Sequence, residues 1–133
     1  MIVVDSSAWI EFLRRTGSSV HLRLRQLIRE RADLAVTEVV VMEVLAGALS
    51  PEDLTQLRAR LHAFPVLGLN GLFGYEAAAD LFRICHSAGE QIRKMTDCLV
   101  AVPTIEAGGT LLHADRDFEI LARHTPLRLE PVT

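Results

Sequence analysis

Short apolar runs alternate along the chain with longer segments in which apolar residues recur every three or four positions. The short runs are rich in Val, Ile and Leu and predict strands over 2–5, 34–36, 65–69, 110–114 and 127–129. The longer segments predict helices over 8–13, 20–31, 38–47, 51–61, 72–88, 97–107 and 117–123. The expected fold class is therefore α/β, with a parallel sheet of four to five strands covered by helices on both faces.

Polar residues mark where several of these helices begin. We expect Ser6 or Ser7 to cap the first helix, because a serine hydroxyl accepts a hydrogen bond from a free backbone amide of the first turn. By the same reasoning, Thr37 caps the third helix and Ser50, just before a proline, caps the fourth. Thr96 is the expected cap of the sixth helix.

Three helical segments carry further expectations. The segment 38–47 is Val-rich near its start and is also compatible with a strand, but its remaining spacing favours a helix. Pro103 lies inside 97–107 and should kink that helix or limit its regularity. In the long fifth helix, the spacing predicts an inward face made of Leu72, Ala79, Phe82 and either Ile84 or Cys85.

Length and composition indicate the general class of the protein. At 133 residues, half of them hydrophobic, the chain fits a single domain over 1–133. No apolar run reaches the roughly 18 residues of a membrane span, and Asp5 interrupts the N-terminus before a signal peptide can form. We therefore expect a cytoplasmic protein without membrane contact. Cys85 and Cys98 fit neither a zinc motif nor a disulfide framework and are expected to be buried thiols.

The distribution of charged residues bears on whether the protein binds nucleic acid. A net charge of −3 argues against wholesale electrostatic binding to nucleic acid. Of the 14 basic residues, 13 are Arg and only Lys94 is Lys, and six Arg lie within residues 1–31. The guanidinium fork suits phosphate oxygens. A solvated helix face explains the same pattern, and charge alone favours that interpretation.

Acidic residues sit in or beside several apolar segments. Asp5 follows the first strand, and Glu43 lies among aliphatic neighbours. Asp97 opens an apolar helix, while Asp115 and Asp117 follow the fourth strand. Taken singly, the aspartates at helix starts are compatible with caps. Open parallel sheets, however, place their sites beyond the C-terminal ends of the strands, where these side chains would meet.

Such a meeting of carboxylates has a chemical consequence. Two unit charges about 5 Å apart repel each other by roughly 3 kcal/mol at an effective dielectric of 20. A cluster of this kind therefore needs a cation, or some of its members take up protons. Oxygen ligands suit Mg²⁺ or Mn²⁺, and a centre of this kind suits the hydrolysis of phosphodiester bonds.

The acidic pattern, read with its flanking residues, resembles the PIN-domain family of metal-dependent ribonucleases, and in particular the VapC toxins of toxin–antitoxin pairs. The resemblance covers essentially the whole chain and rests on four motifs in order, which read IVVDSSAWIE at 2–11, TEVVVMEVLAG at 37–47, RKMTDCLVA at 93–101 and HADRDF at 113–118. One such motif is a weak signal, whereas four at fitting spacings are a strong one. Pro103 departs from the Ala-rich helix usual after the third motif.

The resemblance implies an α/β/α sandwich of the PIN type and cleavage of RNA that depends on Mg²⁺ or Mn²⁺. It implies Asp5, Asp97 and Asp115 as metal ligands, and Glu43 as a catalytic acid that orients a water or binds a second ion. Other roles follow by position in the motifs: Ser7 and Asp117 as auxiliary residues, and Arg93 or Lys94 as contacts to the substrate.

The resemblance also implies partners. These are a structured RNA substrate such as tRNA, a second copy in a homodimer, and a cognate VapB-like antitoxin that inhibits the toxin and can join it in a toxin–antitoxin hetero-oligomer. The candidate antitoxin surfaces are the apolar grooves near the first helices, with Trp9 and Phe12, and the Arg-rich second helix. A role in the core explains Trp9 and Phe12 equally well.

Three other classes of protein share parts of the pattern. A response-regulator receiver needs a Lys near a late strand end, and the only one, Lys94, precedes the wrong segment. A phosphatase of the haloacid-dehalogenase type needs a second Asp two residues after Asp5, where Ser7 stands. A degenerate PIN module that acts only through protein binding is the remaining alternative. The presence of all four motif acids argues against it.

Overall fold

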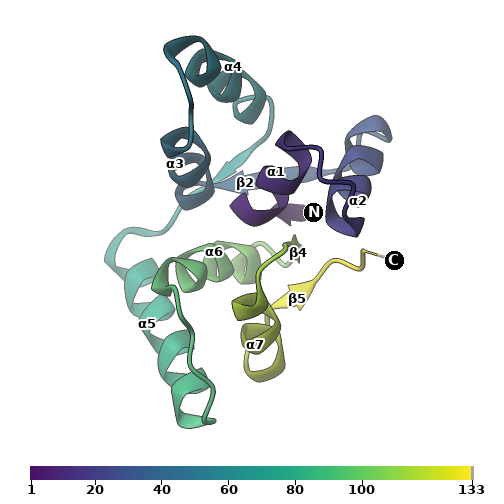
Figure 1. Cartoon of the computed structure of the whole chain (residues 1–133). Coiled ribbons are helices and arrows are strands. Elements are labelled where there is room, and N and C mark those ends of the chain that lie inside the picture. Colours follow the sequence, from purple (N-terminus) through teal and green to yellow (C-terminus); the bar gives the residue numbers. More distant parts are fainter. Residues whose placement is uncertain (133) are drawn as a thin grey trace.

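The computed structural model of the protein describes residues 1–132 and has the alternating architecture that the sequence predicts (Figure 1). The strands of this part of the chain are β1 Ile2–Val4, β2 Leu34–Thr37, β3 Val66–Leu67, β4 Thr110–Leu112 and β5 Arg128–Leu129. The helices are α1 Ser6–Leu13, α2 Ser19–Arg29, α3 Glu38–Ala46, α4 Pro51–Leu61, α5 Gly71–Ser87, α6 Met95–Glu106 and α7 Arg116–His124. The expected α/β class is confirmed.

The five strands form one sheet in the order β3-β2-β1-β4-β5, and every neighbouring pair is parallel. β1 is the central strand. Its Val3 lies opposite Ala35 on one side and Leu111 on the other, and all three side chains are fully buried. Helices cover both faces of a parallel sheet, which explains why the central strands read as unbroken apolar runs.

The strand order places a topological switch point beside β1. From β1 the chain proceeds to β2 and β3 on one side, and it then crosses to β4 on the other side. Val4 pairs with Leu112, and the amide of Asp5 donates to the carbonyl of Leu112 at 3.0 Å. The residues that follow β1 and β4 therefore lie side by side, at the position where open α/β sheets bind their ligands.

The helices form two groups in Figure 1, with α1 to α4 in one half of the molecule and α5 to α7 in the other. α1 packs against α2 and α3, whereas α5 packs against α6 and α7. The groups meet where α3 contacts α6. Trp9 on α1 is 2% exposed and is therefore a core residue, while Phe12 is only partly buried against the same core. The core role suggested for Trp9 is the correct one.

Two of the expected helix caps are wrong. Asp5, and not a serine, caps α1, and it accepts a hydrogen bond from the amide of Ser7. The serines are engaged elsewhere, because Ser6 donates to Glu43 and Ser7 donates its hydroxyl proton to Asp5. α6 begins at Met95 without a side-chain cap, so its expected Thr96 cap is absent. The caps predicted at positions 37 and 50 are confirmed.

Three further expectations have mixed outcomes. α6 runs from Met95 to Glu106 without a break at Pro103, whose ring is buried. The inward face predicted for α5 is only partly correct. Leu72 is 73% exposed and Ala79 is exposed, whereas Cys85 is fully buried and Phe82 is partly buried against the core. β3 is shorter than the segment predicted for it. Both cysteines are buried thiols, as expected.

Membrane-spanning helices are absent from the part of the chain that the structure describes. Within residues 1–132, none of the helices combines the length and the apolar character that crossing a bilayer requires.

Candidate metal centre

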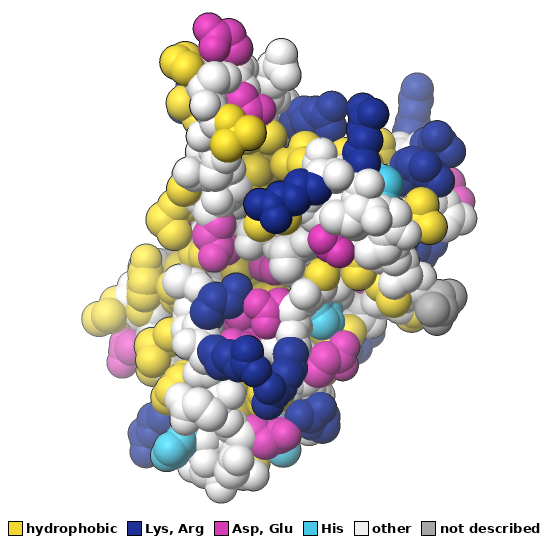
Figure 2. Space-filling view, viewed as in Figure 1, with side chains coloured by type: hydrophobic (Ala, Val, Ile, Leu, Met, Phe, Trp, Pro, Cys, Tyr) yellow, Lys and Arg dark blue, Asp and Glu magenta, His cyan; other side chains and the backbone are white. Residues whose placement is uncertain are grey.

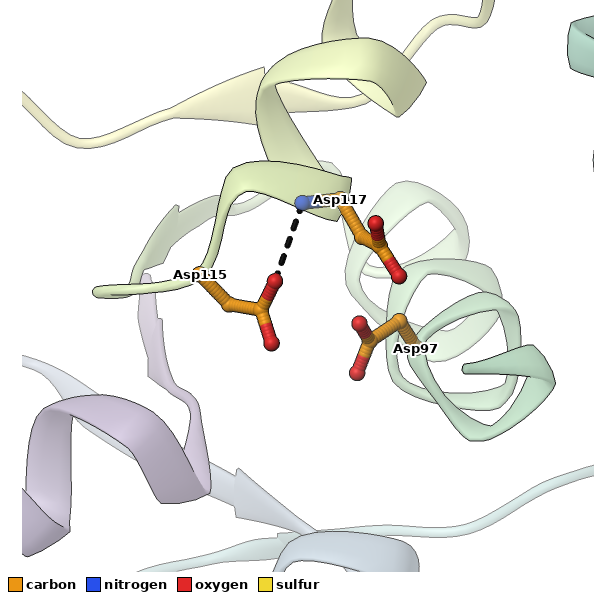
Figure 3. Close-up of side chains that lie close together, drawn as sticks. All are labelled: Asp97, Asp115 and Asp117. Carbon is orange, nitrogen blue, oxygen red and sulfur yellow. Dashed lines mark hydrogen bonds between the residues drawn. The ribbon is translucent and has the colours of Figure 1, made fainter. Parts of the chain in front are cut away.

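Three aspartates from two helix starts converge beside the switch point (Figure 3). Asp97 projects from the first turn of α6, Asp115 precedes α7, and Asp117 lies in the first turn of α7. One carboxylate oxygen of each lies within 4.8 Å of the corresponding oxygens of the other two. Three hard oxygen donors at this spacing fit a divalent cation such as Mg²⁺ or Mn²⁺.

Asp115 and Asp117 each use one oxygen to fix the local backbone. Asp115 caps α7, because its Oδ1 accepts the amide of Asp117 at 3.0 Å. Asp117 Oδ2 accepts the amides of Arg93 and Lys94 at 2.9 and 3.0 Å, which joins the start of α7 to the segment that leads into α6. Both carboxylates therefore build the local structure with one oxygen, while the second oxygen of Asp115 lies against the ammonium of Lys94.

Asp5 lies on the β1 side of the centre and serves as both a cap and a buried acid. Its Oδ2 accepts the hydroxyl of Ser7 at 2.6 Å and the Ser7 amide at 3.0 Å. The amide of Ala114, just after β4, donates to the same hydroxyl at 2.9 Å. Ser7 thus links the ends of the two adjacent strands through Asp5.

Two carboxylate oxygens at the centre are buried without a hydrogen-bond partner among the described residues. They are Oδ1 of Asp5 and Oδ2 of Asp97, and each of these side chains is almost fully buried. Buried charged groups normally find a partner, since an unpaired one carries a large desolvation cost. A bound cation would give a buried carboxylate oxygen of this kind a partner, so the donor set fits a metal ion.

The pKa values reflect this crowding of acids. Burial, together with the nearby charge of Asp5, raises the pKa of Asp97 to about 8, against the lowering effect of Lys94. Burial also raises the pKa of Asp5, although its hydrogen bonds with Ser7 lower it. Without a cation, the centre favours protonated carboxyl groups.

Lys94 provides the positive charge that lies nearest to the acids. Its ammonium lies 2.8 Å from Asp115 Oδ2 and 3.8 Å from Asp97 Oδ1. The hydrogen bond to Asp115 raises the pKa of Lys94 to about 12. Burial acts to raise the pKa of Asp115, but the hydrogen bonds from Lys94 and from the amide of Asp117 bring it below its ordinary value.

Glu43 approaches from the opposite helical group, on α3. Ser6 donates to its Oε1 at 3.0 Å, across 37 positions of sequence. Burial raises the pKa of Glu43, and the charges of Asp5 and Asp115 raise it further, while the Ser6 hydrogen bond lowers it. Glu43 is therefore half-buried and electrostatically coupled to the aspartates.

Compared with the sequence-based expectations, Asp117 lies closer to the centre and Asp5 lies at its edge. Asp117 is 1% exposed and belongs to the set of three close oxygens, which Asp5 does not. Arg93 is exposed beside the centre, so its side chain faces solvent. The sequence pattern does not predict the contact of Ser6 with Glu43. The position of Ser6 next to Asp5, where the first helix is predicted to begin, is the only signal for it.

The fold and the centre together define a parallel α/β protein with an acidic, metal-compatible site at the switch point. The PIN domain profile matches residues 2–124. Ribonuclease VapC11 of Mycobacterium tuberculosis and the VapC ribonuclease Mb1587 of Mycobacterium bovis are each 38% identical to the chain over 129 residues, which is 96% of this chain and 96% of the relative. The chain belongs to the PIN-domain family and, within it, to the VapC ribonucleases.

Solved structures with low sequence identity share the fold. The DNA-bound VapBC of Salmonella typhimurium matches with a TM-score of 0.76 and 18% identity, covering 99% of this chain and 98% of that chain. VapBC2 of Rickettsia felis, bound to a DNA fragment from its promoter, matches with a TM-score of 0.74 and 19% identity, covering 98% of both chains. These matches support the α/β architecture with its parallel sheet.

Proposed function

We propose that the protein is the toxin of a toxin–antitoxin pair, an endoribonuclease that hydrolyses RNA phosphodiester bonds with Mg²⁺ or Mn²⁺. The observation that carries this proposal is the pair of buried, unpartnered carboxylate oxygens of Asp5 and Asp97 beside the close oxygens of Asp115 and Asp117. Such an arrangement is costly in a protein that has no cation to bind. The identity with VapC ribonucleases over nearly the full chain supports it further.

Each residue has a separate task in this proposal. Asp5, Asp97 and Asp115 hold the ion, and Asp117 keeps the segment before α6 in place through its two amide contacts. A divalent ion held there would lower the pKa of a water and polarise the phosphoryl group. Glu43, held by Ser6 and with a raised pKa, orients a water or binds a second ion.

The experiment replaces single buried acids. Asp97→Asn and Asp5→Asn retain the shape of the side chain but remove its charge, so we expect RNA cleavage to fall by at least about a hundredfold. Asp80→Asn on the exposed side of α5 is the matched control and should cleave at the wild-type rate. Wild-type cleavage by the Asp97→Asn protein, after removal of contaminating nucleases, would refute the proposed centre.

The alternative function is a catalytically degenerate PIN module that acts as a protein-interaction domain. It predicts no RNA cleavage by the wild type in millimolar Mg²⁺ or Mn²⁺. The same assay therefore separates the two functions. The RNA target is proposed to be a structured RNA such as tRNA, and mapping of RNA 5′ ends after induced expression identifies it.

The proposed antitoxin partner fits a groove next to the centre. A cavity of about 310 Å³ lies between α1, α3 and α4, with Ile10, Val44 and Leu57 on its walls and Glu43 at its edge. A bound antitoxin segment would cover this acid and keep RNA away from the centre. Co-purification with the product of a neighbouring gene, abolished by Ile10→Glu replacement at the exposed wall of the groove, tests this partner.

The proposed homodimer fits a different surface. The start of α5 exposes three large apolar side chains, Leu72 at 73%, Phe73 at 77% and Tyr75 at 55%. Figure 2 shows hydrophobic side chains gathered along this edge of the molecule. Exposed apolar clusters of this kind mark protein contacts, and a second copy of the chain is the proposed occupant.

A further inference from the structure

A second cavity, of about 350 Å³, lies where the end of α1 meets α2 and α4. Its lining residues are Phe12, Leu13, Arg15, His21, Arg25 and Arg60. The lining contains three guanidinium groups and no carboxylate. Among residues 1–132, none of these arginines forms an ion pair with an acidic side chain. The cavity therefore combines concentrated positive charge with free hydrogen-bond donors.

Aromatic rings lie behind these arginines. Phe12 and His21 meet edge to face with their ring centroids 6.0 Å apart, and the guanidinium carbon of Arg60 lies 6.0 Å from the centroid of Phe12. His21 is buried, and its Nδ1 accepts the amide of Gly17 at 3.0 Å. The proton of the neutral ring is consequently on Nε2, which adds an imidazole N–H donor beside the arginines.

The cavity has a defined place relative to the acidic centre. α1 begins directly after Asp5 and ends at Leu13, a length of about 12 Å at 1.5 Å per residue. The helix thus has a carboxylate of the centre at one end and the arginine cavity at the other. Figure 2 shows Lys and Arg side chains gathered over α2 and the facing end of α4.

The acidic centre alone would repel RNA. It gathers the carboxylates of Asp97, Asp115 and Asp117, with Asp5 beside them, and the whole chain has a net charge of −3. Most affinity for a polyanion comes from basic contacts to its phosphates. A ribonuclease of this charge needs an anion-binding surface outside its metal centre.

We propose that the arginine cavity binds a backbone phosphate of the RNA substrate and so holds the strand along α1 towards the acidic centre. This inference rests on the proposed ribonuclease function. Guanidinium groups from α2, from α4 and from the turn after α1 line this one cavity, and the oxygens of a phosphodiester can accept hydrogen bonds from more than one of them. A carboxylate would need only one of these groups, because a single guanidinium can donate two parallel hydrogen bonds to it.

The test measures RNA binding without cleavage. A labelled single-stranded oligoribonucleotide is titrated with protein in EDTA, and fluorescence anisotropy gives the Kd at several salt concentrations. For Arg25→Gln and Arg60→Gln, we expect the Kd to rise roughly tenfold, as the removal of a charged hydrogen bond predicts. The slope of the logarithm of the association constant against the logarithm of the salt concentration should become shallower by about 0.7 for each phosphate that the variant no longer binds.

Arg15 provides a variant in which folding and binding are separated. Its φ of +51° lies in the left-handed region that glycine favours at a helix end. Arg15→Gly therefore removes a guanidinium without lowering the melting temperature, and we expect RNA binding to weaken nonetheless. Arg31→Gly is the matched control, because Arg31 follows the C-terminal end of α2 at φ +53° and does not line the cavity. It should retain the wild-type Kd.

The outcomes separate the cavity from the proposed function. Weaker binding by the three cavity variants and wild-type binding by Arg31→Gly support the phosphate site. An equally weakened Arg31→Gly would show a diffuse basic surface and overturn it. An unchanged Kd in the cavity variants, with cleavage by the wild type intact, would overturn the site and leave the ribonuclease function standing. Arg25-dependent binding of poly-glutamate, without Arg25-dependent RNA binding, would instead assign the cavity to an acidic peptide.

Discussion

The ammonium group of Lys94 lies 2.8 Å from Oδ2 of Asp115, within the group of acids that fits a divalent ion. It is also 3.8 Å from Oδ1 of Asp97. The chain's only lysine therefore neutralises part of the negative charge that a metal ion would otherwise neutralise. A metal ion and this ammonium compete for the same carboxylates, which places Lys94 in direct control of metal affinity.

Lys94→Met should accordingly raise the affinity of the protein for Mn²⁺, by about tenfold, because it removes a cation from the centre without removing a ligand. Isothermal titration calorimetry of the metal-free protein measures this Kd. Arg93→Met is the control, because the side chain of Arg93 forms no ion pair with the aspartates. Weaker Mn²⁺ binding by Lys94→Met would show that the lysine supports the metal and does not compete with it.

A second prediction concerns the pH dependence of stability. Burial, followed by the charges of the other acids around it, raises the pKa of Asp97 to about 8 from an ordinary value of 3.8. Between these two values the folded protein holds a proton on Asp97 that the unfolded chain has released. The free energy of unfolding of the metal-free protein therefore falls as the pH rises from about 4 to about 8.

Melting curves in EDTA across this pH range measure the effect. Asp97→Asn cannot ionise, so its melting temperature should depend less on pH than that of the wild type and should exceed it near pH 8. Millimolar Mn²⁺ should raise the melting temperature of the wild type most at the high end of the range, because the ion binds the ionised carboxylates. Identical pH profiles for the wild type and Asp97→Asn would contradict the raised pKa.

Much of the fold could be predicted because it depends on local patterns. The buried β-branched run that precedes Asp5 determines a central parallel strand, and the apolar run that ends at Leu112 determines its neighbour. The C-terminal ends of adjacent parallel strands meet, so the approach of Asp5 to the residues after β4 also followed from the pattern. The residue that caps α1 could not be predicted from the sequence, because Asp5 and Ser7 both have side-chain oxygens at the start of this helix.

The details of the centre could not be predicted, because they depend on side-chain directions between segments far apart in sequence. Asp117 accepts amides from residues 23 and 24 positions earlier, and Ser6 reaches Glu43 across 37 positions. Contacts between such distant positions leave no periodic pattern in the sequence. For this reason Asp117 looked like an auxiliary residue in the sequence, whereas the structure groups it with Asp97 and Asp115.

A third prediction follows from the contact between Ser6 and Glu43. Ser6→Ala removes the hydroxyl that orients the carboxylate, so the rate of RNA cleavage should fall by about tenfold or more. The cost to stability should be about 1 kcal/mol, the usual value of one hydrogen bond. Ser87→Ala at the exposed end of α5 serves as control. A Ser6→Ala protein with wild-type kcat would show that Glu43 acts without this support.

The last prediction concerns the proposed homodimer. Phe73 and Leu72 are 77% and 73% exposed at the start of α5, and burying each would contribute roughly 1.5–3 kcal/mol. In a two-fold symmetric contact each side chain occurs twice, so the effect of removing it is counted twice. Phe73→Glu should therefore raise the dimer dissociation constant by at least about a hundredfold. Light scattering coupled to size-exclusion chromatography measures the mass of the wild type and the variant at the same concentrations.

Leu49→Glu is the matched control, because Leu49 is 93% exposed but borders the groove between α1, α3 and α4 instead of the start of α5. It carries the same added charge and should leave the dimer intact. A dimer that tolerates Phe73→Glu would place the contact on another surface. A wild type that is monomeric at every concentration tested would refute the homodimer, and the apolar start of α5 would then need a different protein to cover it.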